Sequence, residues 1–498
     1  MGLILAFLFC LPGMARADCS NLVADVSRGN EQAEVKAFYY AWGEGCAWKE
    51  WSASELLERI LRSEEEGIDP STFDTRSIRD KLRRSSSDPD IRDLLLTRIA
   101  ISYARAMQSG RVDLASTGQD IALPRRNSRI GAQLAEALKE GSLAEWLASL
   151  PPSTPEYKRL KQALAFYKDL ASRVSWPSLG LEPGRRSVKP GEVSPSMPAI
   201  RERLLLLGDL HARSGGHTLN PETVSAVIRF QFRHGLERDG IVGPKTLAAL
   251  NVSPAERAEA IALNMERYRI MFHAMPATRV EVNAAGATAA LYENGVQVFG
   301  MRTIVGKPST PTPVLSSFIN KIILNPPWVI PRSIYVGEIA PAMERDPDYL
   351  AKHDMFWEGG QLVQRPGPKN SLGRLKFEFA SPFAVYLHDT NAPSLFARDN
   401  RFLSHGCIRL EKPLELAAQL LGPSGGTKEE IEAAIAEGET KRFELSRSMP
   451  VVVAYWTAFA SSDGVFHFRD DIYGRDAALA ALLRGESPPS QAAGSCGS

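Results

Sequence analysis

The sequence predicts a multidomain α+β protein with an all-α N-terminal region, a small three-helix unit and a mainly β C-terminal domain that carries a helical capping insert. Its 498 residues are too many for one hydrophobic core. Helical periodicity dominates residues 30–175, whereas short alternating runs rich in aromatic and β-branched side chains dominate residues 276–456. Between them, Pro177 to Pro198 is rich in proline and glycine, which is typical of a linker.

The composition is that of an ordinary globular protein, with 44% apolar and 23% charged residues. The 59 basic and 58 acidic side chains nearly cancel, so the chain has no net field that would attract polyanions. Nucleic acid is therefore not expected as a partner.

The first 17 residues are typical of a signal peptide. Leu3–Leu11 is an apolar run too short to cross a bilayer, and Ala15-Arg16-Ala17 has small residues where a signal peptidase reads them. We expect cleavage before Asp18 and export of the protein. No Lys or Arg precedes the apolar run, which departs from the usual pattern, and a buried first helix is the alternative.

The five cysteines lie in different parts of the chain. Cys10 lies in the predicted signal, and Cys496 lies in a tail (481–498) that we expect to be flexible. Cys19 and Cys46 are close enough in sequence to form a disulfide in an oxidising compartment. Cys407 is the remaining cysteine, and it lies in the β-rich region.

Residues 18–185 are predicted to form a helical scaffold. Ser52 and Glu55 read as a capping box before an apolar stripe that Gly67 ends, and further stripes cover 91–99 and 157–167. We expect these stripes to be buried in a helical core without a catalytic role.

Residues 190–252 are predicted to hold three helices, the last of them opened by Pro244. A capped helix beginning at Ser253 then connects to the β-rich domain (253–275, then 276–480). Asn294-Gly295 predicts a type I′ hairpin. Further strands are expected at Met301–Val305, Phe318–Leu324, Leu375–Phe379, Ala384–His388 and Val451–Trp456. The segment 331–373 interrupts them with helix-like and loop sequence, as a functional lid would.

The residues that carry chemistry are His388 and the run Ser404-His405-Gly406-Cys407, followed by Arg409. A thiol with a pKa of about 8.5 needs a neighbouring base to act as a nucleophile at neutral pH, and a histidine can take that proton and return it to a leaving amine. Gly406 permits a tight turn. The nearby backbone N–H groups could stabilise an oxyanion, and Arg409 suits a substrate carboxylate.

Residue types alone leave two other interpretations open. Cys407 could be a buried structural thiol. It could instead ligate zinc together with histidines, in which case Asp389 or His353 would have to complete the site.

The order of these residues adds to what their types show. Fifteen residues separate His388 from the run Ser404–Cys407, and this pattern resembles the signature of the L,D-transpeptidase catalytic family. The resemblance extends over most of the chain, to the large branch with a helical scaffold. Its further motifs are Val305–Pro308, Thr310–Pro313, Leu324–Trp328, Pro331, Asp346–Leu350, Arg365–Gly367, Asn370–Gly373 and Phe468–Gly474. Val227–Gln231, His234–Leu236 and Asp239–Gly243 resemble a peptidoglycan-binding domain, with a purely structural spacer as the alternative.

The resemblance implies a reaction and roles for its residues. Cys407 would attack the carbonyl that joins the third residue of a stem peptide to D-alanine, and an amine of a second stem would then form a 3→3 cross-link. His388 would be the base, His405 would support the oxyanion or local structure, and Gly406, Ser404 and Arg409 complete the matching positions. Tyr386 and Trp328 would line the donor pocket, with core packing as the alternative.

The resemblance also implies no metal or organic cofactor, a periplasmic location and acylation by carbapenems. The expected partners are a tetrapeptide donor and an amine acceptor, with other cell-wall synthases as further candidates, and we expect a monomer. Deleting part of 340–365 should raise hydrolysis relative to cross-linking, because a lid excludes water. The competing functions are an L,D-carboxypeptidase or other hydrolase on the same fold and a catalytically silent wall-binding protein.

Overall fold

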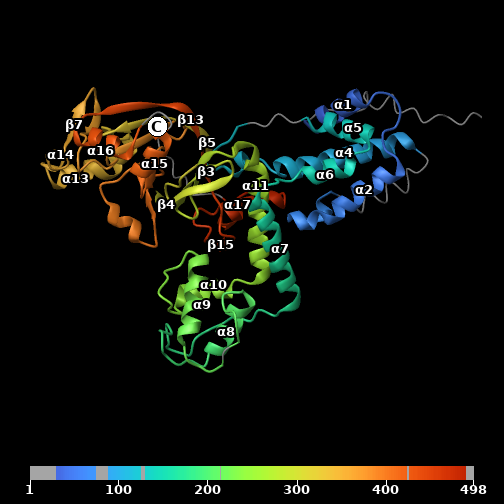
Figure 1. Cartoon of the computed structure of the whole chain (residues 1–498), viewed down its shortest axis with the longest axis horizontal. Helices are drawn as coiled ribbons and strands as arrows, with labels where there is room; N and C mark the ends of the chain where they lie inside the picture. The colour runs from blue at the N-terminus through green and yellow to red at the C-terminus, as the bar shows by residue number, and fades with distance from the viewer. Residues whose placement is uncertain (1–29, 74–87, 125–128, 214, 423–425, 490–498) are drawn as a thin grey trace, which may run out of the picture. The chain divides into compact units, whose positions relative to one another are not determined.

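The computed structural model describes residues 30–73, 88–124, 129–213, 215–422 and 426–489 (Figure 1). The chain divides into two compact units, one of residues 1–108 with 127–151 and one of residues 109–126 with 152–498. The predicted signal peptide, Cys10, Cys19 and Cys496 lie outside the described residues, so the predictions about them remain predictions. Among the described residues, no helix is both long enough and apolar enough to cross a membrane.

The first unit is helical, as the periodicity of its sequence predicts. Its helices are α1 (Asn30–Trp42), α2 (Glu50–Leu61), α4 (Pro89–Ser109), α5 (Ile130–Glu140) and α6 (Leu143–Ser149). They enclose a core that includes Phe38, Leu56 and Tyr103. Within this core, Asp93 accepts hydrogen bonds from the Tyr39 hydroxyl (2.8 Å) and from backbone N–H groups. The buried carboxylate therefore has partners instead of an uncompensated desolvation cost.

Two local predictions in this unit can be compared with the structure. The capping box at Ser52 and Glu55 is wrong, because α2 begins earlier and Ser52 is its third residue. The Ser52 hydroxyl accepts from the Lys49 N–H at 3.0 Å. Gly67 does end the helical segment, with a positive φ of 71°. Cys46 is disulfide-bonded, while a role for Cys19 as its partner remains a prediction.

In the second unit, α7 (Pro155–Arg173) packs against α11 (Pro254–Met271), which begins with the predicted capping box of Ser253 and Glu256. The predicted scaffold range 18–185 is therefore divided, because α7 shares a core with α11. The three-helix unit consists of α8 (Met197–Leu206), α9 (Pro221–Arg233) and α10 (Pro244–Asn251).

The segment 177–198 does not behave as the simple linker that its composition predicts. Leu179 packs against the core of the three-helix unit, and its N–H donates to the Asn251 side chain at 2.7 Å. Val188 forms a β-bridge with Val242. These contacts anchor the segment on the unit that it precedes.

The C-terminal part of the second unit is built around a sheet. Its strands are β1 (Ile121–Ala122), β2 (Arg279–Asn283), β3 (Thr288–Glu293), β4 (Val296–Gly306), β5 (Val314–Leu324), β9 (Leu375–Phe379), β10 (Leu387–His388), β11 (Phe402–Ser404), β12 (Ile408–Leu410) and β13 (Lys441–Ala454). Their order is β1-β5-β13-β2-β3-β4-β12-β10-β9, and β5 also pairs with β9. That pairing closes the ring of strands into a barrel.

The barrel interior is a hydrophobic core that includes Val280, Leu291, Phe377 and Ile408. Asn294 (φ 50°) and Gly295 (φ 82°) form the turn between β3 and β4, so the predicted hairpin is confirmed. β10 is shorter than predicted, because Ala384 has a left-handed φ of 52° and interrupts the extended run.

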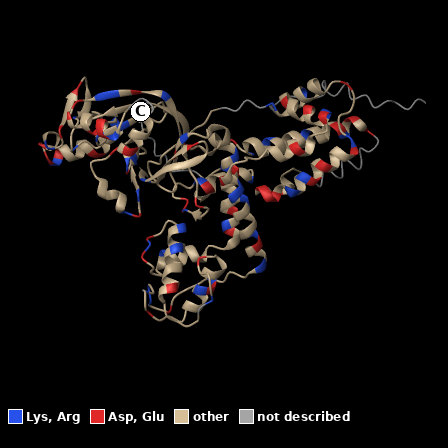
Figure 2. Ribbon diagram, viewed as in Figure 1, with Lys and Arg blue, Asp and Glu red and all other residues tan. Residues whose placement is uncertain are grey.

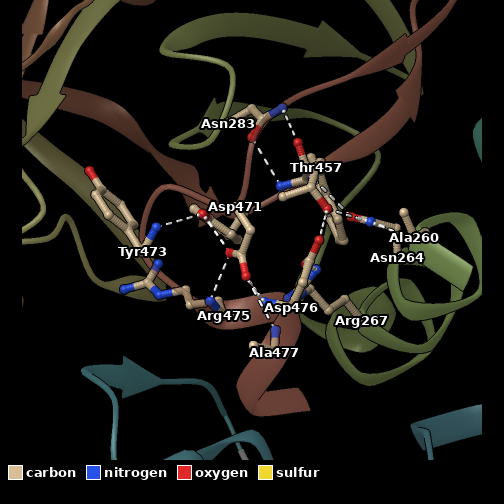
Figure 3. Close-up of polar contacts among 12 residues, drawn as sticks. Ala260, Asn264, Arg267, Asn283, Thr457, Asp471, Tyr473, Arg475, Asp476 and Ala477 are labelled. Atoms are coloured by element: carbon tan, nitrogen blue, oxygen red, sulfur yellow. Dashed lines mark hydrogen bonds and ion pairs between the residues drawn. The ribbon is translucent and has the colours of Figure 1, made fainter. Parts of the chain in front are cut away.

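The C-terminal segment links the barrel to its last helix, α17 (Arg475–Leu483), through buried polar contacts (Figure 3). Asp471 accepts hydrogen bonds from the backbone N–H groups of Arg475, Asp476 and Ala477, and so caps the start of α17. The Tyr473 hydroxyl donates to the carbonyl of Gly306 at 2.5 Å. These contacts give the Phe468–Gly474 motif a structural role. Elsewhere, acidic and basic side chains are interspersed along both units (Figure 2).

Candidate active site

The candidate catalytic residues lie on the outer surface of the barrel, where β10 runs parallel to β12. Leu387 pairs with Ile408, and both are fully buried in the barrel core. Because successive side chains of a strand point to opposite faces, the residues beside this pair point outward together. These outward residues are Tyr386, His388, Cys407 and Arg409.

The Cys407 thiol lies against Tyr386 and the capping insert. The Tyr386 hydroxyl hydrogen-bonds to the side chains of Cys407 and Trp328, and its ring lies 5.6 Å from that of His388, centroid to centroid. Burial, and then the neighbouring thiol, raise the pKa of Tyr386. The phenol therefore stays protonated and can donate to a negatively charged sulfur. The structure brings together the four residues that the sequence singled out here.

His388 is buried and neutral. Desolvation, followed by the positive charge of Arg409, lowers its pKa to about 3, and backbone groups of Leu372 and Asp389 oppose this by hydrogen bonding. Its Nδ1 has no hydrogen-bond partner in the part of the chain that the structure describes, so those hydrogen bonds fall on Nε2. Carbonyl acceptors there fix the tautomer that keeps a lone pair on Nδ1.

The turn before Cys407 is held by hydrogen bonds that explain its sequence. Gly406 has a φ of 106°, which side-chain-bearing residues rarely adopt. The buried Ser404 hydroxyl donates to the Cys407 carbonyl at 2.6 Å and accepts from the Gly406 N–H at 3.2 Å. The Gly406 N–H is thus already engaged, so the contribution of Gly406 is its conformation. The Thr312 hydroxyl also donates to the Gly406 carbonyl, at 2.9 Å.

A second glycine supports this turn from β4. A Cβ at Gly306 would lie 2.1 Å from the Thr310 carbonyl oxygen, so only glycine lets the two segments approach this closely. The Gly306 N–H donates to the Thr312 hydroxyl at 2.9 Å, and its carbonyl accepts from Tyr473. The C-terminal motif therefore supports the turn before Cys407 through Gly306 and Thr312.

One positive side chain, Arg409, lies near the thiol, and a second, Lys376, lies beside Tyr386. Arg409 is attracted to negative charge on Cys407, and its Nε has no hydrogen-bond partner among the described residues. The Lys376 ammonium lies 4.4 Å from the Tyr386 ring centroid and 3.1 Å from a Glu378 oxygen. These charges can stabilise a thiolate or attract a substrate carboxylate.

The insert at 331–373 has its own small core and a sheet that the sequence did not predict. Its elements and the flanking β6 are β6 (Trp328–Val329), α12 (Arg332–Ile334), the π-helix η6 (Tyr335–Ile339), α13 (Ala340–Arg345), α14 (Tyr349–Lys352), β7 (Met355–Glu358) and β8 (Gln361–Gln364). Ile330, Ile339 and Leu362 form the core of the insert. The three strands pair in the order β6-β8-β7. Their runs are too short to stand out as strands in the sequence.

The insert reaches the turn before Cys407 through Glu338 of the π-helix. A Glu338 carboxylate oxygen lies 2.8 Å from His405 Nε2 and 4.0 Å from Lys307 Nζ. His405 thus contacts the insert. His388 instead lies on β10, which pairs with β12, the strand that follows Cys407. Sequence reasoning missed Glu338 and Lys376, which belong to no recognised motif. Thr312 and Tyr473 lay within motifs that it quoted for family resemblance alone.

The zinc interpretation gains no support from the residues it needed. His353 Nδ1 lies 2.8 Å from the Tyr349 carbonyl oxygen, and Asp389 accepts from the Arg374 N–H at 2.8 Å. Within the described ranges, no group of three or more His, Cys, Asp or Glu side chains could hold a metal ion.

We expect acid to destabilise this fold through its buried histidines. Burial lowers the pKa of His388 to about 3 and of His467 to about 4, whereas both titrate near 6.5 when unfolded. Between these values the unfolded chain binds more protons, so stability is full above about pH 6.5 and falls as the pH drops toward 4. The loss should be about 1.4 kcal/mol per pH unit for each histidine. Urea unfolding at pH 7.5, 6 and 5 would measure it, and a flat profile would contradict it.

Comparison with known proteins finds three family matches along the chain. Residues 277–453 match the family model described as an L,D-transpeptidase catalytic domain. Residues 33–164 match a scaffold domain, and residues 194–250 match a domain described as "Putative peptidoglycan binding domain".

A curated protein of Haemophilus influenzae, named "Putative L,D-transpeptidase", is 31% identical over 240 residues. The match covers 44% of this chain and 48% of that protein, so the chain spans about half the length of this curated relative.

Solved L,D-transpeptidases show weaker likeness. One from Xylanimonas cellulosilytica is 17% identical, with 55% of this chain and 99% of that chain covered and a TM-score of 0.18. One from Stackebrandtia nassauensis is 13% identical, with 56% and 97% covered and a TM-score of 0.21. TM-scores this low carry no argument, and the family rests on the sequence matches. The multidomain α+β class is confirmed, and residues 277–453 match the L,D-transpeptidase catalytic domain.

Proposed function

We propose that this protein forms 3→3 cross-links between peptidoglycan stem peptides through a thioester on Cys407. One observation carries the proposal: a thiol, a neutral histidine with an unpartnered Nδ1 and a cation share one outer patch of the barrel. A nucleophile, a base and a charge stabiliser are the groups that acyl transfer needs. The patch also lies beside an insert able to exclude water.

In the acylation step, His388 Nδ1 takes the thiol proton while Cys407 Sγ attacks the carbonyl between the third stem residue and D-alanine. The C–N bond to D-alanine breaks, and the leaving amine receives the proton from His388. The acyl group remains on Cys407 as a thioester. Burial keeps the imidazole uncharged in the resting protein, so Nδ1 holds a lone pair that can accept the proton.

In the transfer step, an amine of a second stem attacks the thioester. His388 takes a proton from that amine and returns it to the departing sulfur, which restores the thiol. We propose that Arg409 binds a stem carboxylate, because its guanidinium lies near Cys407 and its buried Nε has no partner among the described residues. Tyr386 and Trp328 would line the donor pocket, and Ser404 and Gly406 would hold the turn.

The test is incubation of the protein with a disaccharide-tetrapeptide, followed by mass spectrometry of the products. We expect dimers that have lost one D-alanine per cross-link, and acylation of Cys407 by a carbapenem in place of the donor. Monomers trimmed by one residue, without dimers, would instead indicate a hydrolase on the same fold. Absence of both products and of the carbapenem adduct would indicate a catalytically silent wall-binding protein.

The insert gives a second prediction, in which Glu338→Gln raises hydrolysis relative to cross-linking. The substitution removes the charge that ties the π-helix to His405 and Lys307. Partly exposed pairs of this kind contribute at most about 1 kcal/mol, so the hydrolysed fraction should rise about two- to fivefold. The ratio of trimmed monomer to dimer measures it.

Glu344→Gln, which changes an exposed carboxylate on α13 of the same insert, is the matched control and should leave the ratio unchanged. An equal ratio in both variants and the parent protein would show that the Glu338 contact does not hold the insert closed.

A further inference from the structure

A cleft of about 690 Å³ lies outside the candidate active site and contains none of its residues. Its floor is the outer face of β2, β3 and β4, opposite the barrel core. Its walls come from α7, α11, α9 of the peptidoglycan-binding domain and the hairpin of β14 (Ala458–Ala460) and β15 (Phe466–Phe468). The volume lies in the range of small-molecule binding sites.

The cleft exists because small residues meet on its floor. Ala290 of β3 pairs with Gly300 of β4, and both line the cleft. A Cβ at Gly300 would lie 2.8 Å from the Gln297 amide nitrogen, so this flexible side chain would have to shift to make room for it.

Aromatic side chains form its walls. Phe232 of α9 is 43% exposed, and its ring meets His467 edge to face at 5.2 Å. On the other side Phe459 stacks on His467 at 5.0 Å. The Arg238 guanidinium lies over the Phe232 ring at 5.5 Å, and that of Arg469 lies over the Phe459 ring at 5.3 Å. The exposed part of Phe232 is therefore the apolar surface that a ring-shaped ligand would meet.

Four charged side chains of the cleft form two ion pairs, and Glu156, Lys412 and Arg469 also line it. Arg279 donates to one Glu281 oxygen at 2.7 Å, and Trp456 donates to the other at 2.9 Å. Likewise, the Nε and backbone N–H of Arg302 bind the two Glu411 oxygens at 2.9 and 3.0 Å. A charged ligand group that bound any of these four residues would have to break an existing pair, so the floor around them favours neutral groups.

Polar side chains also lie beside the aromatic rings. His467 lines the cleft and is 3% exposed, with its Nε2 3.0 Å from the Ser461 hydroxyl. Its Nδ1 is buried with no hydrogen-bond partner among the described residues. A ligand hydroxyl would instead meet the neutral polar side chains of Thr288 and Gln297, which also line the cleft. Aromatic faces with neutral hydrogen-bonding groups fit a sugar better than a charged peptide.

The cleft and the nucleophile lie along the same strand. Glu411 follows β12, and its N–H still donates to the Arg302 carbonyl at 3.2 Å, so Cys407, Arg409 and Glu411 alternate outward. Four residues of strand place Glu411 about 13 Å from Cys407. Three extended stem residues span about 10–11 Å. With its link to the sugar, a stem could reach the thiol from a glycan held in the cleft.

We propose that this cleft binds the glycan backbone of peptidoglycan and so presents the attached stem to Cys407. That the sugar is cell-wall glycan rests on the proposed function, whereas the preference for a neutral, polyhydroxylated ring ligand rests on the cleft alone. Phe232 gives the peptidoglycan-binding domain a direct part in the site.

The first test is titration of the full chain with a stem-free tetrasaccharide of alternating N-acetylglucosamine and N-acetylmuramic acid in which each lactyl carboxyl is converted to an amide, so that the ligand is neutral like the stem-bearing glycan. Ala290→Phe fills the floor and should weaken binding at least about tenfold, and Phe232→Ala should weaken it about three- to tenfold. Two substitutions outside the cleft serve as controls and should stay within about twofold. They are Val298→Phe on β4 (50% exposed) and Phe166→Ala on α7 (43% exposed).

The proposal is supported if the tetrasaccharide binds the parent protein saturably, and if this binding is weakened in both cleft variants and kept in both controls. Lack of binding by the parent protein, or equal affinity in Ala290→Phe and Val298→Phe, overturns it. If the sugar-free tetrapeptide, and not the glycan, loses affinity in Ala290→Phe, the assignment to a sugar is wrong.

A second measurement separates this proposal from the proposed function. Acylation of Cys407 is followed with a free tetrapeptide and with the disaccharide-tetrapeptide. We expect a lower KM for the sugar-linked donor, lost in Ala290→Phe, with unchanged acylation by the free peptide. An equal KM for both donors in the parent protein would overturn the presenting role. If neither donor acylates the protein while the glycan still binds, the proposed function is wrong, whereas the proposal that the cleft binds glycan is still supported.

Discussion

Cys407→Ala is expected to abolish the covalent stem-peptide adduct. The thiol is the only group in the outer patch able to become an acyl carrier, since its neighbours there are a phenol kept protonated by burial, an imidazole and a guanidinium. Removing a nucleophile of this kind lowers turnover on the order of 10⁴–10⁶-fold. Intact-mass spectrometry after incubation with disaccharide-tetrapeptide measures the adduct directly.

Cys496→Ala provides the matched control, because it removes a cysteine from the C-terminal tail, where we expect no chemistry. It should acylate like the parent protein. An adduct that persists in Cys407→Ala, or one that disappears in Cys496→Ala, would show that the nucleophile is another residue and that the proposed mechanism is wrong.

His388→Gln should slow acylation about 10²–10⁴-fold, the usual contribution of a general base. Glutamine approximates the volume of the imidazole and can still donate to backbone carbonyls, but its amide cannot accept the thiol proton. Because the pKa of His388 is about 3, the parent protein should also show no loss of acylation rate near pH 6.5. Single-turnover acylation between pH 5 and 8 tests both statements.

His353→Gln is the control for this substitution. His353 lies at the end of α14 and bonds the Tyr349 carbonyl, away from the nucleophile's strand, so its loss should change acylation less than about twofold. Thermal unfolding of both variants checks that they fold. A His388→Gln variant with parent-like acylation would remove His388 from the mechanism.

The sequence alone determined the local elements whose signals are short-range. Asn294-Gly295 specifies its turn because both residues tolerate positive φ. Ser253 and Glu256 specify the start of α11 because the capping contacts span only three residues. The run around Cys407 and its histidine were found by their resemblance to a family signature, and the structure places Tyr386, His388, Cys407 and Arg409 on one surface.

Only the tertiary structure decided how distant segments act on these residues. Glu338 reaches His405 from the insert, and Tyr473 supports Gly306 from the C-terminal end. The packed course of segment 177–198 likewise depends on partners such as Val242. The cleft over β2–β4 needs the register that sets Ala290 opposite Gly300. Such contacts join residues far apart in the chain, and no local pattern encodes them, because their energy comes from surfaces that meet only after folding.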